Sequence, residues 1–159
     1  MGEFEKRLSQ VRAEMERGEF KRASRLLAPL VRDGVPEALF LYSTFSIAGS
    51  ESDAEFEKRS LELLTRSAQA GYPPALYALG ACYDAGDLVE RDTYRAAALF
   101  KEAADRGHAK AMFLHGLNLM AAINGMPSLP VDGLELVKSA ARAGDDDAVQ
   151  FLADRGIRA

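Results

Sequence analysis

Few side chains in this sequence are of the types that catalyse reactions or bind metal ions. Among its 159 residues are two histidines, His108 and His115, and one cysteine, Cys82. A zinc site needs three or four protein ligands, and neither histidine has a cysteine or carboxylate at an obvious ligand spacing. The sequence also lacks a Gly-x-Ser-x-Gly motif, a phosphate-binding glycine loop and a His-Glu-x-x-His motif. We therefore predict no catalytic residue, no metal ion and no cofactor, and a protein that is not an enzyme.

The charge and composition argue against several classes of partner. The chain has 20 Lys and Arg against 24 Asp and Glu, a net charge of −4, and so no general attraction to nucleic acid. No stretch approaches the ~18 apolar residues of a membrane span, and the first residues lack the apolar core of a signal peptide. A single cysteine is typical of a reducing compartment. We expect a cytoplasmic protein that binds neither nucleic acid nor membranes.

Side chains suited to binding recur at a regular spacing instead. Phe40, Tyr77 and Phe113 follow one another at intervals of 37 and 36 residues. A row of aromatic rings on an open face can anchor an apolar peptide or helix. The same rings can equally pack between neighbouring structural repeats. The sequence leaves these two alternatives open.

The spacing of the rings follows a repeat that runs through the chain. Intervals of 37, 36 and 37 residues separate Gly34, Gly71, Gly107 and Gly144. The fourth residue after each of these glycines is an alanine. A glycine at the end of an apolar run is typical of the left-handed residue that ends a helix. Each unit is therefore predicted to be a helix, a turn and a second helix.

The apolar residues within each unit have a helical period. Between residues 94 and 106 the positions i, i+3, i+4, i+7 and i+8 are taken by Ala96, Leu99, Phe100, Ala103 and Ala104. Near the N-terminus, Gly18 ends a first helix and residues 20–32 form the second. Asp145 or its neighbours cap a last helix. We predict one domain of about nine helices, with units at about 1–34, 35–71, 72–107 and 108–144 and a closing helix at 145–155.

The best-defined unit has a distinctive order of small, aromatic and charged residues. It reads Ala75-x-x-x-Leu79-Gly80-x-x-Tyr83-x-x-Gly86-x-x-Val89-x-x-Asp92-x-x-x-Ala96-x-x-x-Phe100-x-x-Ala103-Ala104-x-x-Gly107-x-x-x-Ala111. This pattern resembles the Sel-one-like repeat, a relative of the tetratricopeptide repeat. The resemblance is partial for residues 38–74 and 111–148 and weak for 1–34. In the unit that follows, the repeat's Leu, Tyr and Gly become His115, Leu119 and Ala122.

The resemblance implies an all-α, right-handed α-solenoid of stacked helix-turn-helix repeats. Such solenoids serve mainly as adaptors and scaffolds, and their first helices line a concave face. In the register of tetratricopeptide first helices, the partner-binding positions are Phe40, Thr44, Ile47, Tyr77, Ala81, Asp84, Lys110, Phe113, Leu117 and Met120. The same register also includes Glu37, Ala48, Pro74, Ala85 and Ala121.

We interpret the chain as an adaptor or scaffold that binds another protein or peptide on this concave face. An alternative in the same class is a dedicated inhibitor or immunity-type protein that neutralises one toxin or enzyme through the irregular loop at residues 124–130. A remote alternative is a hydrolase, because some cysteine-rich relatives have been assigned hydrolytic activity. Their disulfide framework is absent here. Apolar residues near both ends also leave a homodimer open.

Overall fold

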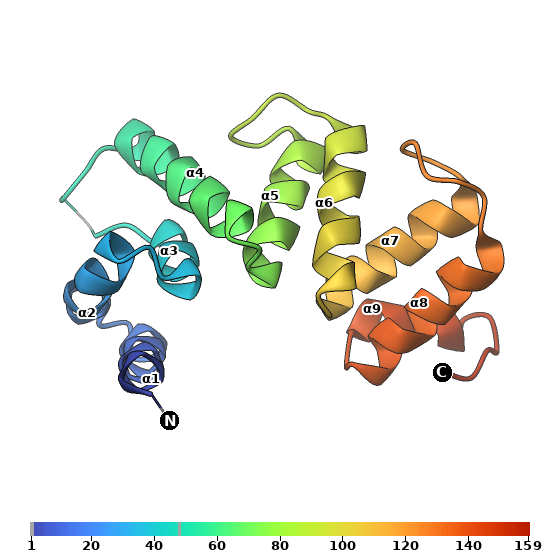
Figure 1. Ribbon diagram of the computed structural model, residues 1–159, viewed down its shortest axis with the longest axis horizontal. Coiled ribbons are helices and arrows are strands. Elements are labelled where there is room, and N and C mark those ends of the chain that lie inside the picture. Colours follow the sequence, from blue (N-terminus) through green and yellow to red (C-terminus); the bar gives the residue numbers. More distant parts are fainter. Residues whose placement is uncertain (1, 48) are drawn as a thin grey trace. The chain divides into compact units, whose positions relative to one another are not determined.

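The computed structural model describes residues 2–47 and 49–159, and every regular element in these ranges is an α-helix (Figure 1). The helices are α1 (Glu3–Glu16), α2 (Phe20–Arg32), α3 (Pro36–Ser43), α4 (Asp53–Gln69), α5 (Pro73–Ala85), α6 (Thr93–Asp105), α7 (Ala109–Ala121), α8 (Pro130–Arg142) and α9 (Asp146–Ala153). Helices make up 71% of the described residues. The prediction of an all-α chain of about nine helices is confirmed for the described residues.

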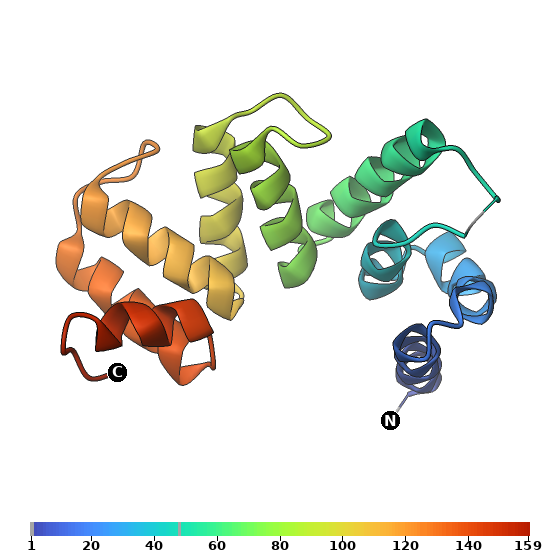
Figure 2. The same cartoon turned by 180° about the vertical axis from the view of Figure 1, so that it is seen from behind.

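The chain divides into two compact units, Met1–Ala75 and Leu76–Ala159, and each is described by itself. The sequence predicts a single repeat domain, and its predicted unit boundaries at residues 34, 71, 107 and 144 all fall in turns between helices. Figure 2 shows from behind how α7 and α8 lie side by side in the second unit. No helix in the described part of the chain combines the length and the apolar composition needed to cross a bilayer.

The turns at these four boundaries share one hydrogen-bonding pattern. The left-handed region, with φ between 73° and 90°, is occupied by Gly34, Gly71, Gly107 and Gly144. The residue after each glycine donates its N–H to the carbonyl five residues earlier, as Val35 does to Leu30 and His108 to Ala103, both at 3.0 Å. This is the Schellman arrangement, in which a residue without Cβ avoids steric strain. The prediction that each glycine ends a helix is confirmed.

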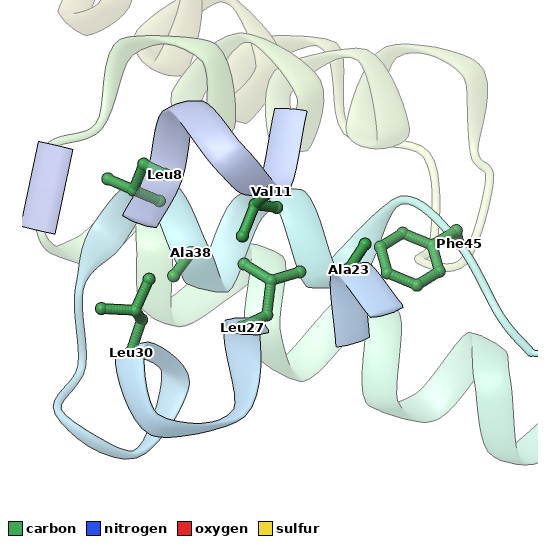
Figure 3. Packing of buried hydrophobic residues seen from close by; sticks show 7 residues of the cluster. All are labelled: Leu8, Val11, Ala23, Leu27, Leu30, Ala38 and Phe45. Carbon is green, nitrogen blue, oxygen red and sulfur yellow. The ribbon is translucent and has the colours of Figure 1, made fainter. Parts of the chain in front are cut away.

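The core of the first unit lies between α1, α2 and α3. Figure 3 shows it as Leu8, Val11, Ala23, Leu27, Leu30, Ala38 and Phe45. The three members from α2 are fully buried and recur every three or four residues, so they lie on one side of that helix. The opposite side of α2 faces solvent.

The second unit depends on a close approach of α7 and α8. A Cβ atom on Gly133 of α8 would lie 2.5 Å from the carbonyl oxygen of Gly116 on α7, and a Cβ on Gly116 would lie 2.7 Å from the carbonyl oxygen of Gly133. The adjoining core consists of Phe113, Val137, Ala140, Ala141, Ala148 and Leu152. The two helices therefore touch backbone to backbone.

Candidate functional site

Two rings of the aromatic row contact the turn that begins the next repeat. In the first unit the ring centroid of Phe40 lies 5.6 Å from that of Tyr72. In the second unit Tyr77 stacks on His108, with centroids 4.7 Å apart and planes 17° apart. Tyr72 and His108 are equivalent positions, because each directly follows the glycine of its turn. The rings of Phe40 and Tyr77 are both half-buried.

Phe113, the third ring of the row, is buried, with 8% of its surface exposed. Its ring meets that of Phe151 on α9 edge to face, with centroids 5.8 Å apart. Phe151 lies 38 residues further along the chain and so continues the row in the next repeat. These contacts match the alternative in which the row packs between consecutive repeats. That the rings also touch a partner stays a prediction.

The imidazole that stacks on Tyr77 has a structural role in its own repeat. The Nδ1 atom of His108 accepts a hydrogen bond from the N–H of Ala111 at 3.3 Å and so caps α7. Burial lowers the pKa of His108, against the opposing charge of Asp145. Burial also raises the pKa of Tyr77, and Asp145 adds to that increase. A neutral imidazole can accept the capping bond, so this pair stabilises the repeat near neutral pH.

Ion pairs connect successive first helices at another equivalent position. Glu37 and Lys110 each stand three residues after the glycine of their turn. Arg12 of α1 pairs with Glu37 of α3 in the first unit, and Lys110 of α7 pairs with Asp147 of α9 in the second. Lys110, predicted to face a partner, is therefore engaged in contacts between α7 and α9.

The predicted helical register does not extend to Thr44 and Ile47, because α3 ends at Ser43. The guanidinium of Arg59 on α4 donates to the carbonyl of Tyr42 at 2.6 Å and to that of Phe45 at 3.0 Å. Arg59 thus binds two carbonyl groups that would accept backbone hydrogen bonds if the helix continued for another turn. Thr44 is consequently the exposed C-cap and Ile47 lies in the loop. Ala48 lies outside the described residues.

The same guanidinium binds the far end of the loop. Arg59 donates to both carboxylate oxygens of Glu51, at 2.9 and 2.6 Å, and this hydrogen bonding lowers the pKa of Glu51. It also lies 4.4 Å from the centroid of the Tyr42 ring. No motif in the sequence marks Arg59, because two of its partners are backbone carbonyls 14 and 17 residues away.

The remaining predicted positions keep part of their surface open. Asp84 near the end of α5 is exposed, and Ala81 one turn earlier is half-buried. On α7, Leu117 and Met120 are half-buried and pack against the core of the second unit. Together they offer apolar contact area and one carboxylate. Such groups suit the binding of another surface.

Two potentially reactive side chains lie elsewhere in the second unit. His115 has 5% of its surface exposed, and its buried Nδ1 atom has no hydrogen-bond partner among the described residues. Burial, and next the charge of Lys101, lower its pKa. Burial raises the pKa of Cys82, so the thiol stays protonated at neutral pH. Across residues 2–47 and 49–159, no group of three His, Cys, Asp or Glu side chains is placed to hold a metal ion.

The loop between α5 and α6 borders an open hollow that no sequence motif indicates. Tyr83 and residues 89–95 line it, and its volume is about 780 Å³. The guanidinium of Arg95 lies 4.4 Å over the ring of Tyr83. The side chain of Tyr94 projects outward with 68% of its surface exposed. A hollow of this kind depends on loop conformation, which the repeat pattern does not specify.

These features define a helical repeat protein in which, within each unit, contacts connect the first helices of successive repeats. Residues 73–108 match the Sel1 repeat family. A Sel1 repeat protein from Oxalobacter formigenes has a similar structure, with a TM-score of 0.72, 30% identity and coverage of 83% of this chain and 38% of that one. Residues 73–108 thus form a Sel1-like repeat, and the chain has an all-α solenoid fold similar to that of Sel1 repeat proteins.

Two further solved structures share the fold. A protective antigen of uropathogenic Escherichia coli with an SLR fold gives a TM-score of 0.69 at 24% identity, covering 84% of this chain and 29% of that one. The cysteine-rich protein B of Helicobacter pylori gives a TM-score of 0.57 at 18% identity, covering 79% of this chain and 94% of that one.

Chitin synthase regulatory factor 3 of Schizosaccharomyces pombe is a longer relative. It is 28% identical over 118 residues, which are 74% of this chain and 13% of that protein. The chain thus spans only a small part of this relative and well under half of the Oxalobacter formigenes protein. Sel1 repeat proteins generally mediate protein–protein interactions, and most are scaffolds without enzymatic activity.

Proposed function

We propose that this chain is an adaptor that binds a segment of another protein on the open side of its first helices. The observation that carries this proposal is the pair Leu117 and Met120 on α7. They stand three residues apart, so they lie on one face of the helix, and each keeps part of its surface exposed. An apolar side chain next to a flexible Met gives an adaptable contact surface for an apolar partner.

The similar proteins support binding rather than catalysis. The fission yeast relative bears the name of a regulatory factor for chitin synthase, a role that a binding protein can fill. The chemistry of the chain points the same way. His108 serves as a helix cap, His115 is buried and Cys82 is held as a thiol. We infer that the chain acts by binding and carries no catalytic activity of its own.

The test is a capture experiment from the native host with the immobilised chain. The variant Leu117→Gln/Met120→Gln should lose the captured partner, because polar amides weaken an apolar contact. Val131→Gln is the matched control, since Val131 is 75% exposed and lies on α8, a second helix. Circular dichroism must show that all three proteins are equally helical. Equal capture by the parent and the α7 variant would contradict the proposal.

A second candidate is the dedicated inhibitor, and the loop between α7 and α8 favours it. Asn124 donates from its amide to the Asn118 side chain at 3.1 Å, and the N–H of Leu129 donates to the carbonyl of Leu119 at 3.1 Å. The loop thus held exposes two large apolar side chains, Ile123 at 48% and Leu129 at 42%. Capture that survives changes on α7 but fails in Ile123→Ser/Leu129→Ser would favour this candidate.

A further inference from the structure

The exposed side of α2 is cationic in a chain that is acidic overall. The helix contains Lys21, Arg22, Arg25 and Arg32 and no Asp or Glu. The chain as a whole has a net charge of −4. Positive charge is therefore concentrated on one short element of the first unit.

Three of these cations form a stripe opposite the buried face. At 3.6 residues per turn, Lys21, Arg25 and Arg32 lie within about 40° of one another around the helix axis. All three are exposed, while Ala23, Leu27 and Leu30 on the other side are fully buried. The stripe extends for about 16 Å along the axis. Ala28, also exposed, lies in the middle of the stripe and lets another backbone come close.

The stripe has no counter-charge within the described chain. Arg22, about a quarter-turn around the helix from the stripe, lies 4.0 Å from Glu14 of α1. Lys21, Arg25 and Arg32 take part in no ion pair with any residue of 2–47 or 49–159. The charges of the stripe are thus free to meet a partner.

The position of Lys21 also opposes the stability of its own helix. It lies in the first turn of α2, which contains no acidic residue. The N-terminus of a helix carries a partial positive charge, and a cation there is repelled. The nearest carboxylates along the chain, Glu19 and Asp33, stand at the two caps and outside the stripe. Helix stability therefore does not explain why a cation stands at this position.

We propose that the outer face of α2 binds an acidic segment of a partner protein, with carboxylates spaced to meet Lys21, Arg25 and Arg32. This surface is on a second helix and is separate from the α7 surface of the proposed function. A protein segment fits better than nucleic acid, because the stripe is short. The exposed Glu16 and Glu19 on the neighbouring segment would repel a longer run of phosphates.

The experiment is an NMR titration of the full chain with a synthetic probe. The probe is a helical alanine-based peptide with Glu at positions i, i+4, i+7 and i+11, and its control has the same composition with Glu spread around the helix. Saturable shifts should occur at the amides of α2. The variant Lys21→Gln/Arg25→Gln/Arg32→Gln should lower the association constant about tenfold. The matched control Lys58→Gln/Arg66→Gln/Arg158→Gln removes three exposed cations elsewhere and should leave it unchanged.

A single substitution separates binding from folding. Lys21→Glu should raise the midpoint of thermal unfolding, because an acidic residue in the first turn interacts favourably with the helix dipole. The same substitution should weaken binding of the acidic peptide. The proposal is overturned if the peptide causes no saturable shifts on α2, or if both peptides or both triple variants behave alike. The proposal is also overturned if a DNA duplex shifts the same amides at a lower concentration than the peptide does, because α2 would then be a nucleic-acid-binding surface.

Discussion

The helix pairs α3–α4 and α7–α8 occupy equivalent places in their repeats but are held together differently. In α7–α8 the backbones touch at Gly116 and Gly133. In α3–α4 polar side chains bridge the helices: the hydroxyl of Ser60 donates to the carbonyl of Ser43 at 2.7 Å, and that of Ser67 to the carbonyl of Pro36 at 2.6 Å. The same repeat therefore specifies the turns without specifying how the helices within a pair are joined.

The difference has consequences for tolerance to change. At a backbone contact no side chain can move aside, so the α7–α8 pair should be destabilised by any atom added there. The α3–α4 pair instead depends on hydrogen bonds and on Arg59, whose loss leaves carbonyl groups without partners. The α7–α8 pair should therefore be destabilised by overpacking, and the α3–α4 pair by the loss of polar contacts.

The largest effect is expected from Gly133→Ala on α8. Its Cβ would lie 2.5 Å from the carbonyl oxygen of Gly116, so the helices must separate. We expect the free energy of unfolding to fall by about 3 kcal/mol, measured by urea denaturation. Glu135→Ala, at an exposed position of the same helix, is the control. A loss no greater than that of the control would mean that the backbone contact is not needed.

Arg59→Met should have the next largest effect, in the first unit. It removes the hydrogen bonds to the carbonyls of Tyr42 and Phe45 while keeping an apolar stem of similar length. We expect a loss of about 2 kcal/mol in the free energy of unfolding. Lys58→Met, at the exposed neighbouring position, should change little. If the two variants were equally stable, the hydrogen bonds of Arg59 would not be needed to hold α3 and α4 together.

His115→Leu should stabilise the second unit, most strongly in acid. Burial, and next the charge of Lys101, lower the pKa of His115 in the folded chain, while the nearby Asp105 opposes the shift. The unfolded chain takes up the proton near pH 6.5, so stability is complete above that pH and is lost as the pH falls below it. We expect a gain of about 1 kcal/mol at neutral pH and more in acid.

Urea unfolding of the parent and the Leu variant at two pH values tests this. The stability difference between them should widen on going from above pH 6.5 to below it. Part of the acid dependence should remain in the Leu variant, because the pKa of His108 is also lowered by burial. A difference that stays constant with pH would show that His115 does not titrate below its ordinary range.

Ala122→Gly should give the smallest effect, a stabilisation of about 0.5–1 kcal/mol. Ala122 has φ of 52° at the end of α7, in the left-handed region where a side chain is strained. Ala121→Gly is the matched control, because Ala121 is the last helical residue and glycine there should destabilise the chain. Thermal denaturation should shift in opposite directions for the two variants. If both variants shifted in the same direction, the positive φ of Ala122 would not be the cause of the stabilisation.

Much of the fold follows from the sequence because its markers are local. The Gly-x-x-x-Ala repeat predicts the four turns, and all four glycines have positive φ. The range 20–32 predicted for the second helix agrees with Phe20–Arg32. Asp145 caps the last helix as predicted, accepting from the N–H of Ala148 at 2.9 Å. Each of these features depends on the conformation of a few consecutive residues.

The candidate site was less predictable. The sequence predicts that the register of the first helices extends to Thr44 and Ile47, but α3 ends before them. The helix stops because Arg59, which belongs to the next helix, binds carbonyls near its end. The packing of Phe113 against Phe151 likewise joins residues 38 positions apart. The partner-binding residues as a set stay a prediction.

The sequence by itself determined the helices, their turns and the period of the repeat, because left-handed glycines and apolar stripes act within a few residues. The tertiary structure alone decided which side chains became contacts between repeats and which stayed open. Phe40, Tyr77 and Phe113 share one register, yet their exposure depends on rings from the following repeat. Contacts of that kind depend on how whole helices pack, and the spacing of residues along the chain does not specify that packing.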